Sequence, residues 1–153
     1  MAVGRCWRRA TARIPGFAPL REEDVLLVGA RDLTPEQAAV LDDAALTWLP
    51  PARLRRPGEV AAALDALAER VDGLHFHVDL DVHDPSIAPA NGYAAPDGLS
   101  AADVLEVLAL AALRRPVVSA TLASFDPDYD VDGRMLATGL ELLEALAGAA
   151  GPN

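Results

Sequence analysis

An acidic cluster follows residues 74–78, in which apolar side chains alternate with histidines. Residues 77–85 read His-Val-Asp-Leu-Asp-Val-His-Asp-Pro. Side chains two apart on a strand point the same way, so Asp79 and Asp81 share a face if the strand continues that far. A buried unpaired carboxylate costs roughly several kcal/mol. The pair therefore requires arginine partners, protonation or metal ions. The residues alone do not decide among these three ways of neutralising the carboxylates. The simplest structural interpretation is that the acids cap a turn and form ion pairs with arginines.

If metal is the answer, the ligand types indicate which ions fit. Carboxylate oxygens suit Mg²⁺, Mn²⁺ or Ca²⁺, and added imidazole favours Mn²⁺, Zn²⁺ or Fe²⁺. His77 could hydrogen-bond to its neighbour Asp79, although a core histidine is the simpler expectation. His83 is predicted to point either into the mouth of the site or into solvent. Asp84-Pro85 is typical of a turn, as are the acids of residues 126–132.

The surrounding pattern predicts the elements that position this cluster. Short apolar runs predict strands, and apolar residues at spacings of three and four predict helices. Thr34 and Ser100 are expected to cap two of the helices. The alternation predicts a mostly parallel sheet with helices on both faces, a three-layer α/β/α fold in which both acidic segments follow strand ends. The expected strands are 25–29, 45–49, 74–80 and 117–122, and the expected helices are 34–42, 58–71, 101–113 and 133–147, with 53–57 as a loop.

Length and composition limit the function classes. The 153 residues are expected to form one domain, 1–153, with an irregular segment at 1–20. A formal charge of −10 argues against a nucleic-acid partner. The single cysteine, Cys6, excludes an internal disulfide and a cysteine-cluster zinc site. No apolar run is long enough to cross a membrane, so a cytoplasmic protein is expected.

The cluster and its downstream loop resemble the hallmark segment of the arginase, agmatinase and formimidoylglutamase (ureohydrolase) superfamily. In that family an Asp-x-Asp-x-x-Asp-Pro stretch leads through Ala-Pro and Pro-x-Gly-Gly-Leu-Ser/Thr into a helix. Here the matching stretches are 79–85, Ala88-Pro89 and 96–100, with Asp97 in place of the first glycine and Gly98 in place of the second. The likeness extends to residues 25–33 and 124–127, so it covers nearly the whole chain.

The resemblance implies the C-terminal half of an arginase-like fold and a binuclear Mn²⁺ site. It implies that Asp79 bridges two ions and that Asp81 binds one of them. The metals would activate a water that attacks a C–N bond of a linear amidine, a guanidino or formimino compound.

Two departures from the family pattern bear on activity. The family's Gly-Gly-Asp-His and Asp-Ala-His-x-Asp segments do not occur in this sequence. The metal site of this chain is therefore expected to be incomplete, and the chain alone is expected to be weakly active or inactive. Ser124, the candidate substrate-binding residue, stands where family members usually carry a glutamate for the guanidinium. No residue is assigned a catalytic role.

Two other functions stay open at this point. One is a degenerate, non-catalytic α/β module for oligomerisation or subunit pairing. The other is a mononuclear Mg²⁺ or Ca²⁺ domain that rests only on the acidic strand ends. A parallel sheet with uncovered edges favours pairing with another chain, so a homo-oligomer is expected.

Overall fold

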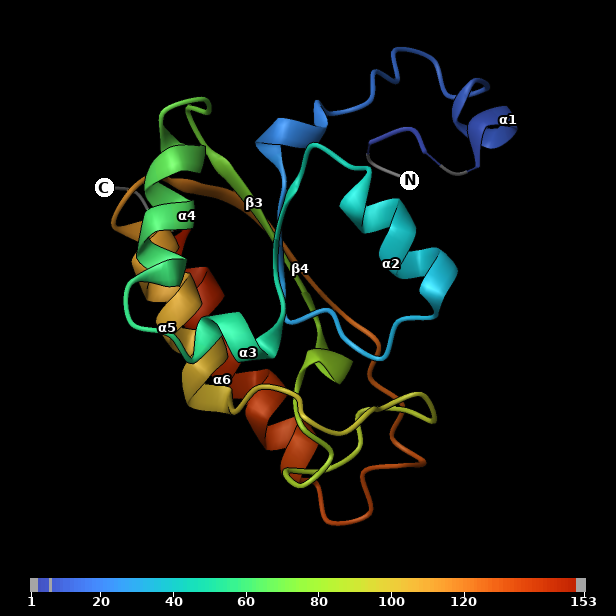
Figure 1. Cartoon of the computed structure of the whole chain (residues 1–153). Coiled ribbons are helices and arrows are strands. Elements are labelled where there is room, and N and C mark those ends of the chain that lie inside the picture. Colours follow the sequence, from blue (N-terminus) through green and yellow to red (C-terminus); the bar gives the residue numbers. More distant parts are fainter. Residues whose placement is uncertain (1–2, 6, 151–153) are drawn as a thin grey trace.

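The computed structural model describes residues 3–5 and 7–150. It is an α/β fold in which strands and helices alternate along the chain, as the sequence predicts (Figure 1). The strands are β1 (Leu26–Val28), β2 (Thr47–Leu49), β3 (Leu74–Asp79) and β4 (Val117–Ala123). The helices are α1 (Arg8–Thr11), α2 (Pro35–Asp42), α3 (Pro51–Leu54), α4 (Glu59–Ala68), α5 (Ala101–Ala112) and α6 (Arg134–Ala149), with 3₁₀ turns at Glu22–Asp24 and Leu80–Val82.

All strand pairing within the described residues is parallel, and it comes in two separate pairs. β1 pairs with β2, and β3 pairs with β4. In Figure 1, α4, α5 and α6 lie on one side of the strands and α2 lies on the other. The end of β1 packs against the turn after β3, where a Cβ on Gly29 would lie 2.6 Å from a methyl group of Val82.

The core lies between the β3–β4 pair and helices α5 and α6. Val78 and Leu80 contribute from the β3 side, while Leu108 and Leu142 are 3% and 1% exposed on the two helices. Residues of β3 alternate between this core and the opposite side, because strand side chains have a period of two. We call that opposite side, which carries His75, His77, Ser119 and Thr121, the open face; all of these four side chains are exposed.

Helix caps form where the sequence predicts them. The Thr34 and Ser100 side chains accept hydrogen bonds from the third amides of α2 and α5, and the side chains at those third positions bond back. These are capping boxes, which satisfy two otherwise unpaired amides at each helix start. The second one begins α5 directly after the loop that follows the acidic cluster.

The structure corrects one helix prediction and one loop prediction. The helix expected over 58–71 ends at Ala68, because the chain turns at Asp72-Gly73 to enter β3. Residues 51–54, expected in part as a solvated loop, form the helical turn α3, with Pro51 at its first position. Arg53 there donates to the Trp48 carbonyl and pairs with Glu59, so it is a structural residue.

Candidate functional site

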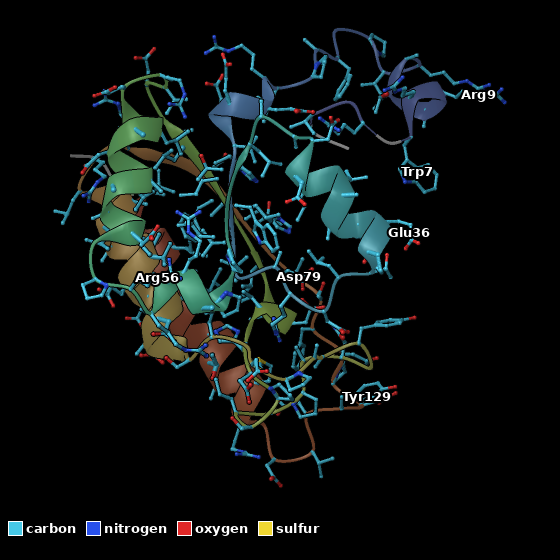
Figure 2. The ribbon with its side chains drawn as sticks, in the orientation of Figure 1. Trp7, Arg9, Glu36, Arg56, Asp79 and Tyr129 are labelled. Atoms are coloured by element: carbon cyan, nitrogen blue, oxygen red, sulfur yellow. The ribbon has the colours of Figure 1, made fainter. Side chains whose placement is uncertain are left out.

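The acidic cluster lies at the carboxyl end of β3, where ligands of parallel α/β folds bind. Figure 2 shows Asp79 at that end, between the helices on either side. The strand stops at Asp79, and the following 3₁₀ turn carries Asp81. The condition for a shared strand face, that the strand continues to Asp81, is therefore not met. A turn aligns them instead, because an Asp79 carboxylate oxygen accepts a hydrogen bond from the Asp81 amide at 3.2 Å.

The two carboxylates share a partly buried position without a cationic side-chain partner. Within residues 3–5 and 7–150, no arginine or histidine forms an ion pair with Asp79 or Asp81. Burial raises the pKa of Asp81, and the neighbouring Asp79 carboxylate raises it further. Two adjacent acids that resist joint ionisation form a site at which a cation lowers the electrostatic cost.

Arg31 stabilises the segment that holds this pair, but through backbone atoms. Its guanidinium donates to the carbonyls of Asp81 at 3.0 Å and Val82 at 3.2 Å. It also donates to the carbonyls of His83, Ala95 and Pro96. Arg31, in the loop that follows β1, therefore binds both the turn after β3 and the distal part of the loop before α5. Nothing in the spacing of residues 25–33 identified this role.

Asn91 connects the pair to Ser124. Its side-chain amide lies 3.2 Å from the Ser124 carbonyl and 3.5 Å from an Asp81 carboxylate oxygen. The structure thus brings together Asp79, Asp81 and Ser124, the three site residues predicted from sequence. Ser124 is exposed and has a positive φ of 68°. Asn91 was not predicted, because a single asparagine in a Pro- and Gly-rich loop looks like an ordinary turn residue.

The histidines of the cluster do not join the acids. The predictions that His83 faces the site mouth or solvent were both wrong, since His83 is 1% exposed. Its Nδ1 lies 3.0 Å from the Leu80 carbonyl, and its Nε2 has no hydrogen-bond partner within the described residues. Burial lowers the pKa of His83, so the ring is neutral in the fold at neutral pH. Among the residues that the structure describes, no hydrogen bond joins His77 to Asp79.

The turn prediction is confirmed for Asp84 and Asp126, while Asp130 accepts from the start of a helix. Asp84 accepts hydrogen bonds from the amides of Ser86 and Gly98, at 2.9 and 3.0 Å. Asp126 accepts from the Asp128 amide, and Asp130 accepts from two amides at the start of α6.

Asp84 allows a pH test of this loop. Hydrogen bonds from Ser86, followed by that from Gly98, hold the pKa of Asp84 at about 2, below its value in an unfolded chain. The folded state therefore binds fewer protons than the unfolded state between about pH 4 and 2, so this contribution to stability is present above about pH 4 and is lost as pH falls towards 2. We expect Asp84→Asn to be less stable than the wild type at pH 6, with the difference shrinking below pH 4. Urea unfolding at pH 6, 4 and 3 measures it, and a constant difference would contradict the assignment.

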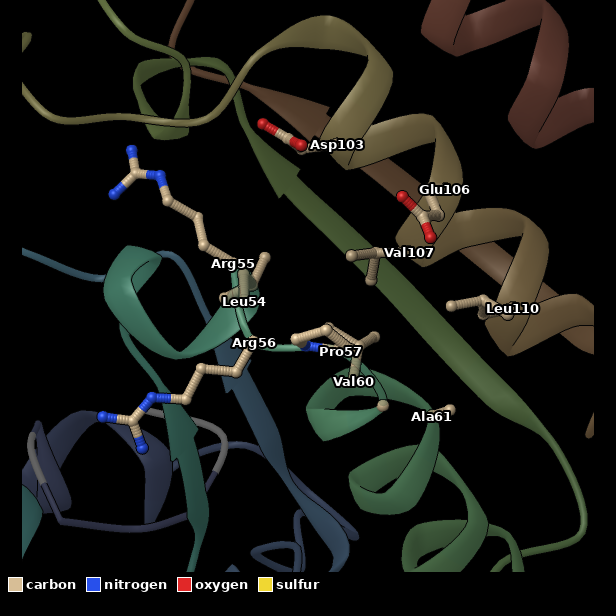
Figure 3. Close-up of a pocket in the computed structure, with 11 residues that line it drawn as sticks. Leu54, Arg55, Arg56, Pro57, Val60, Ala61, Asp103, Glu106, Val107 and Leu110 are labelled. Atoms are coloured by element: carbon tan, nitrogen blue, oxygen red, sulfur yellow. The ribbon is translucent and has the colours of Figure 1, made fainter.

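The donor set fits part of a metal site. Two adjacent carboxylates are ligands that Mn²⁺ accepts. In the part of the chain that the structure describes, no group of three or more His, Cys, Asp or Glu side chains gathers in a metal-binding arrangement. A cavity of about 320 Å³ lies elsewhere, between the α3–α4 connection and α5, and it is lined by Arg55, Arg56 and Glu106 rather than by the acidic pair (Figure 3). No helix of the described residues is long and apolar enough to span a membrane.

Comparison with known proteins places this geometry in a family. The model of the arginase family matches residues 5–148. The arginase of Brucella melitensis is 33% identical over 136 residues, which cover 86% of this chain and 44% of that relative. The formimidoylglutamase of Hahella chejuensis is 35% identical over 96 residues, which cover 61% of this chain and 29% of that relative.

Solved structures agree with the sequence comparison. The crystal structure of Bacillus subtilis arginase superposes with a TM-score of 0.79 at 25% identity, over 93% of this chain and 50% of that one. The chain thus spans about half the length of the relatives it matches. The fold, the acidic pair and these matches together show that the chain belongs to the arginase family.

Proposed function

We propose that this chain supplies one part of a metal-dependent hydrolase site for C–N bonds of linear amidines, a guanidino or formimino compound. The carboxylate pair Asp79 and Asp81, at the end of β3, is the observation that carries the proposal. Asp79 and Asp81 would together hold the Mn²⁺, with the remaining ligands supplied from outside the described residues. The bound metal would supply a nucleophile by lowering the pKa of water.

The protein's own residues have separate tasks in this proposal. Asp79 and Asp81 hold cations at the strand end, and Asn91 keeps the Asp81 carboxylate beside the loop of Ser124. The Ser124 hydroxyl can donate or accept one hydrogen bond but carries no charge. It therefore fits an uncharged or weakly basic part of a substrate better than a guanidinium, because losing a charged partner costs about 2–5 kcal/mol.

A reconstitution experiment tests the proposal. The chain is mixed, in Mn²⁺, with the portion of Brucella melitensis arginase that the match does not cover. Urea from arginine or agmatine, and formamide from a formimino amino acid, are then measured. We expect negligible release from the chain alone and measurable release from the mixture, abolished by Asp79→Asn. Equal release from wild-type and Asp79→Asn mixtures would contradict the proposal, as would full activity of the chain alone.

A non-catalytic pairing module is the second candidate, and one surface favours it. β4 pairs only with β3 among the described strands, and Leu136, Leu140 and Leu143 of α6 are each about half exposed. A free strand edge beside exposed leucines favours association with another chain, including a second copy. The same mixture separates the candidates: a complex in light scattering without any hydrolysis supports the module.

A further inference from the structure

The open face of the β3–β4 pair carries two histidines that the proposed hydrolase site does not use. His75 and His77 are both exposed and alternate with Phe76, which packs towards the core. They therefore project from the same side of one strand. Their cross-strand neighbours are Ser119 and Thr121. Neither imidazole forms an ion pair within residues 3–5 and 7–150.

Contacts across the strands fix the orientation of the first imidazole. Nδ1 of His75 lies 2.8 Å from the Ser119 hydroxyl, and its Nε2 lies 3.4 Å from the Thr121 hydroxyl. Thr121 is the register partner of His77. The ring of His75 thus leans along the strand towards the position that His77 occupies. The shorter contact at Nδ1 is the outer hydrogen bond usual for histidine ligands, and a metal at Nε2 would replace that nitrogen's longer contact with Thr121.

The spacing suits chelation of one ion. Residues two apart on a strand have Cα atoms about 6.7 Å apart. Two nitrogens bound to one ion lie within about 4 Å of each other, because each metal–nitrogen bond is about 2.0–2.1 Å long. Rotation of the two exposed side chains can bring the imidazole nitrogens closer together than the Cα atoms. We propose that His75 and His77 form a second metal site, for a borderline divalent ion of the Cu²⁺, Ni²⁺ or Zn²⁺ class, with water completing the coordination.

This site differs in chemistry from the carboxylate pair. Imidazole prefers the later transition metals and binds Cu²⁺ most strongly, whereas carboxylates prefer Mn²⁺ and Mg²⁺. The inference is independent of the hydrolase proposal, since it rests on different side chains and a different ion. It also does not involve His83, whose buried ring has no access to solvent ions.

Copper binding tests the proposal in a Cys6→Ser background, which removes the only thiol. One equivalent of Cu²⁺ is added to the protein, and electron paramagnetic resonance is used to detect nitrogen coupling. We expect coupling from two imidazoles. In His75→Gln/His77→Gln we expect the coupling to vanish and the affinity to fall at least about tenfold, because even an outer hydrogen-bond partner contributes roughly 10–100-fold. Ser119→Ala is expected to weaken binding about tenfold while keeping both nitrogens.

Asp79→Asn/Asp81→Asn provides the control that separates this site from the proposed hydrolase site, and it should leave the copper spectrum unchanged. Circular dichroism of each variant checks the fold, which exposed histidine substitutions should preserve. An unchanged spectrum in the double histidine variant would overturn the proposal. Loss of the spectrum in the aspartate variant would overturn it as well.

Discussion

Replacing Arg31 with methionine should destabilise the protein by about 3 kcal/mol and loosen the segment that carries the acidic pair. The guanidinium donates to five carbonyl oxygens, on the turn after β3 and on the loop before α5. A hydrogen bond to a charged group contributes about 1.5–3 kcal/mol, and part of the loss is recovered by water because Arg31 is only partly buried. Methionine keeps an unbranched apolar stem and removes every donor.

Two companion variants make the Arg31 test specific. Arg31→Lys keeps the charge but offers three donors from a single nitrogen, so we expect it to recover only part of the stability. Arg55→Met removes an exposed arginine and should change the free energy of unfolding by less than about 0.5 kcal/mol. Urea denaturation measures all three. Equal midpoints for the wild type and Arg31→Met would show that the carbonyl contacts do not stabilise the fold.

Gly98→Ala should be comparably damaging, for a steric reason. A Cβ at this position would lie 2.4 Å from the Asp84 nitrogen and 2.5 Å from the His83 carbonyl carbon. These are backbone atoms of a parallel bridge in which the Asp84 amide donates to Leu99 and the Leu99 amide donates to Val82. The backbone must separate to admit the methyl group, so we expect a loss of about 3 kcal/mol or more.

Gly148→Ala is the matched control for that substitution. Gly148 lies in α6, and nothing lies within 4 Å of a Cβ built there. Alanine should stabilise this helix by up to about 1 kcal/mol, because glycine is the poorer helix former. Thermal unfolding should therefore shift in opposite directions for the two variants. A Gly98→Ala protein as stable as the wild type would mean that the loop can move away from the bridge.

The sequence predicted the parts of this site that depend on local pattern. Asp79 and Asp81 follow an apolar run, Ser100 precedes a helical period, and Ser124 follows the last strand; each such pattern extends over a few neighbouring residues. Arg31 and Asn91 were not predicted, because Arg31 contacts residues 50 to 65 positions away and Asn91 joins residues 10 and 33 positions away. Tertiary contacts of that kind leave no period in the sequence.

The errors have similar physical causes. The prediction for His83 failed because a polar residue in a loop is usually exposed, whereas this loop folds back and pairs His83 with Leu99. The predicted strand ran past Asp79 because Leu80 and Val82 continue the alternation of apolar residues. In the structure, the Asp81 amide donates to the Asp79 side chain and a 3₁₀ turn begins there instead.

The most direct test of the central proposal, that Asp79 and Asp81 hold a metal, is paramagnetic broadening of amide resonances by Mn²⁺, which detects weak as well as tight binding. We predict selective broadening of Asp81, Asn91 and Ser124 in the wild type. It should persist in the charge-matched control Asp72→Asn/Asp132→Asn, where two exposed acids are removed, and disappear in Asp79→Asn/Asp81→Asn. The same broadening in the wild type and in Asp79→Asn/Asp81→Asn would contradict the account.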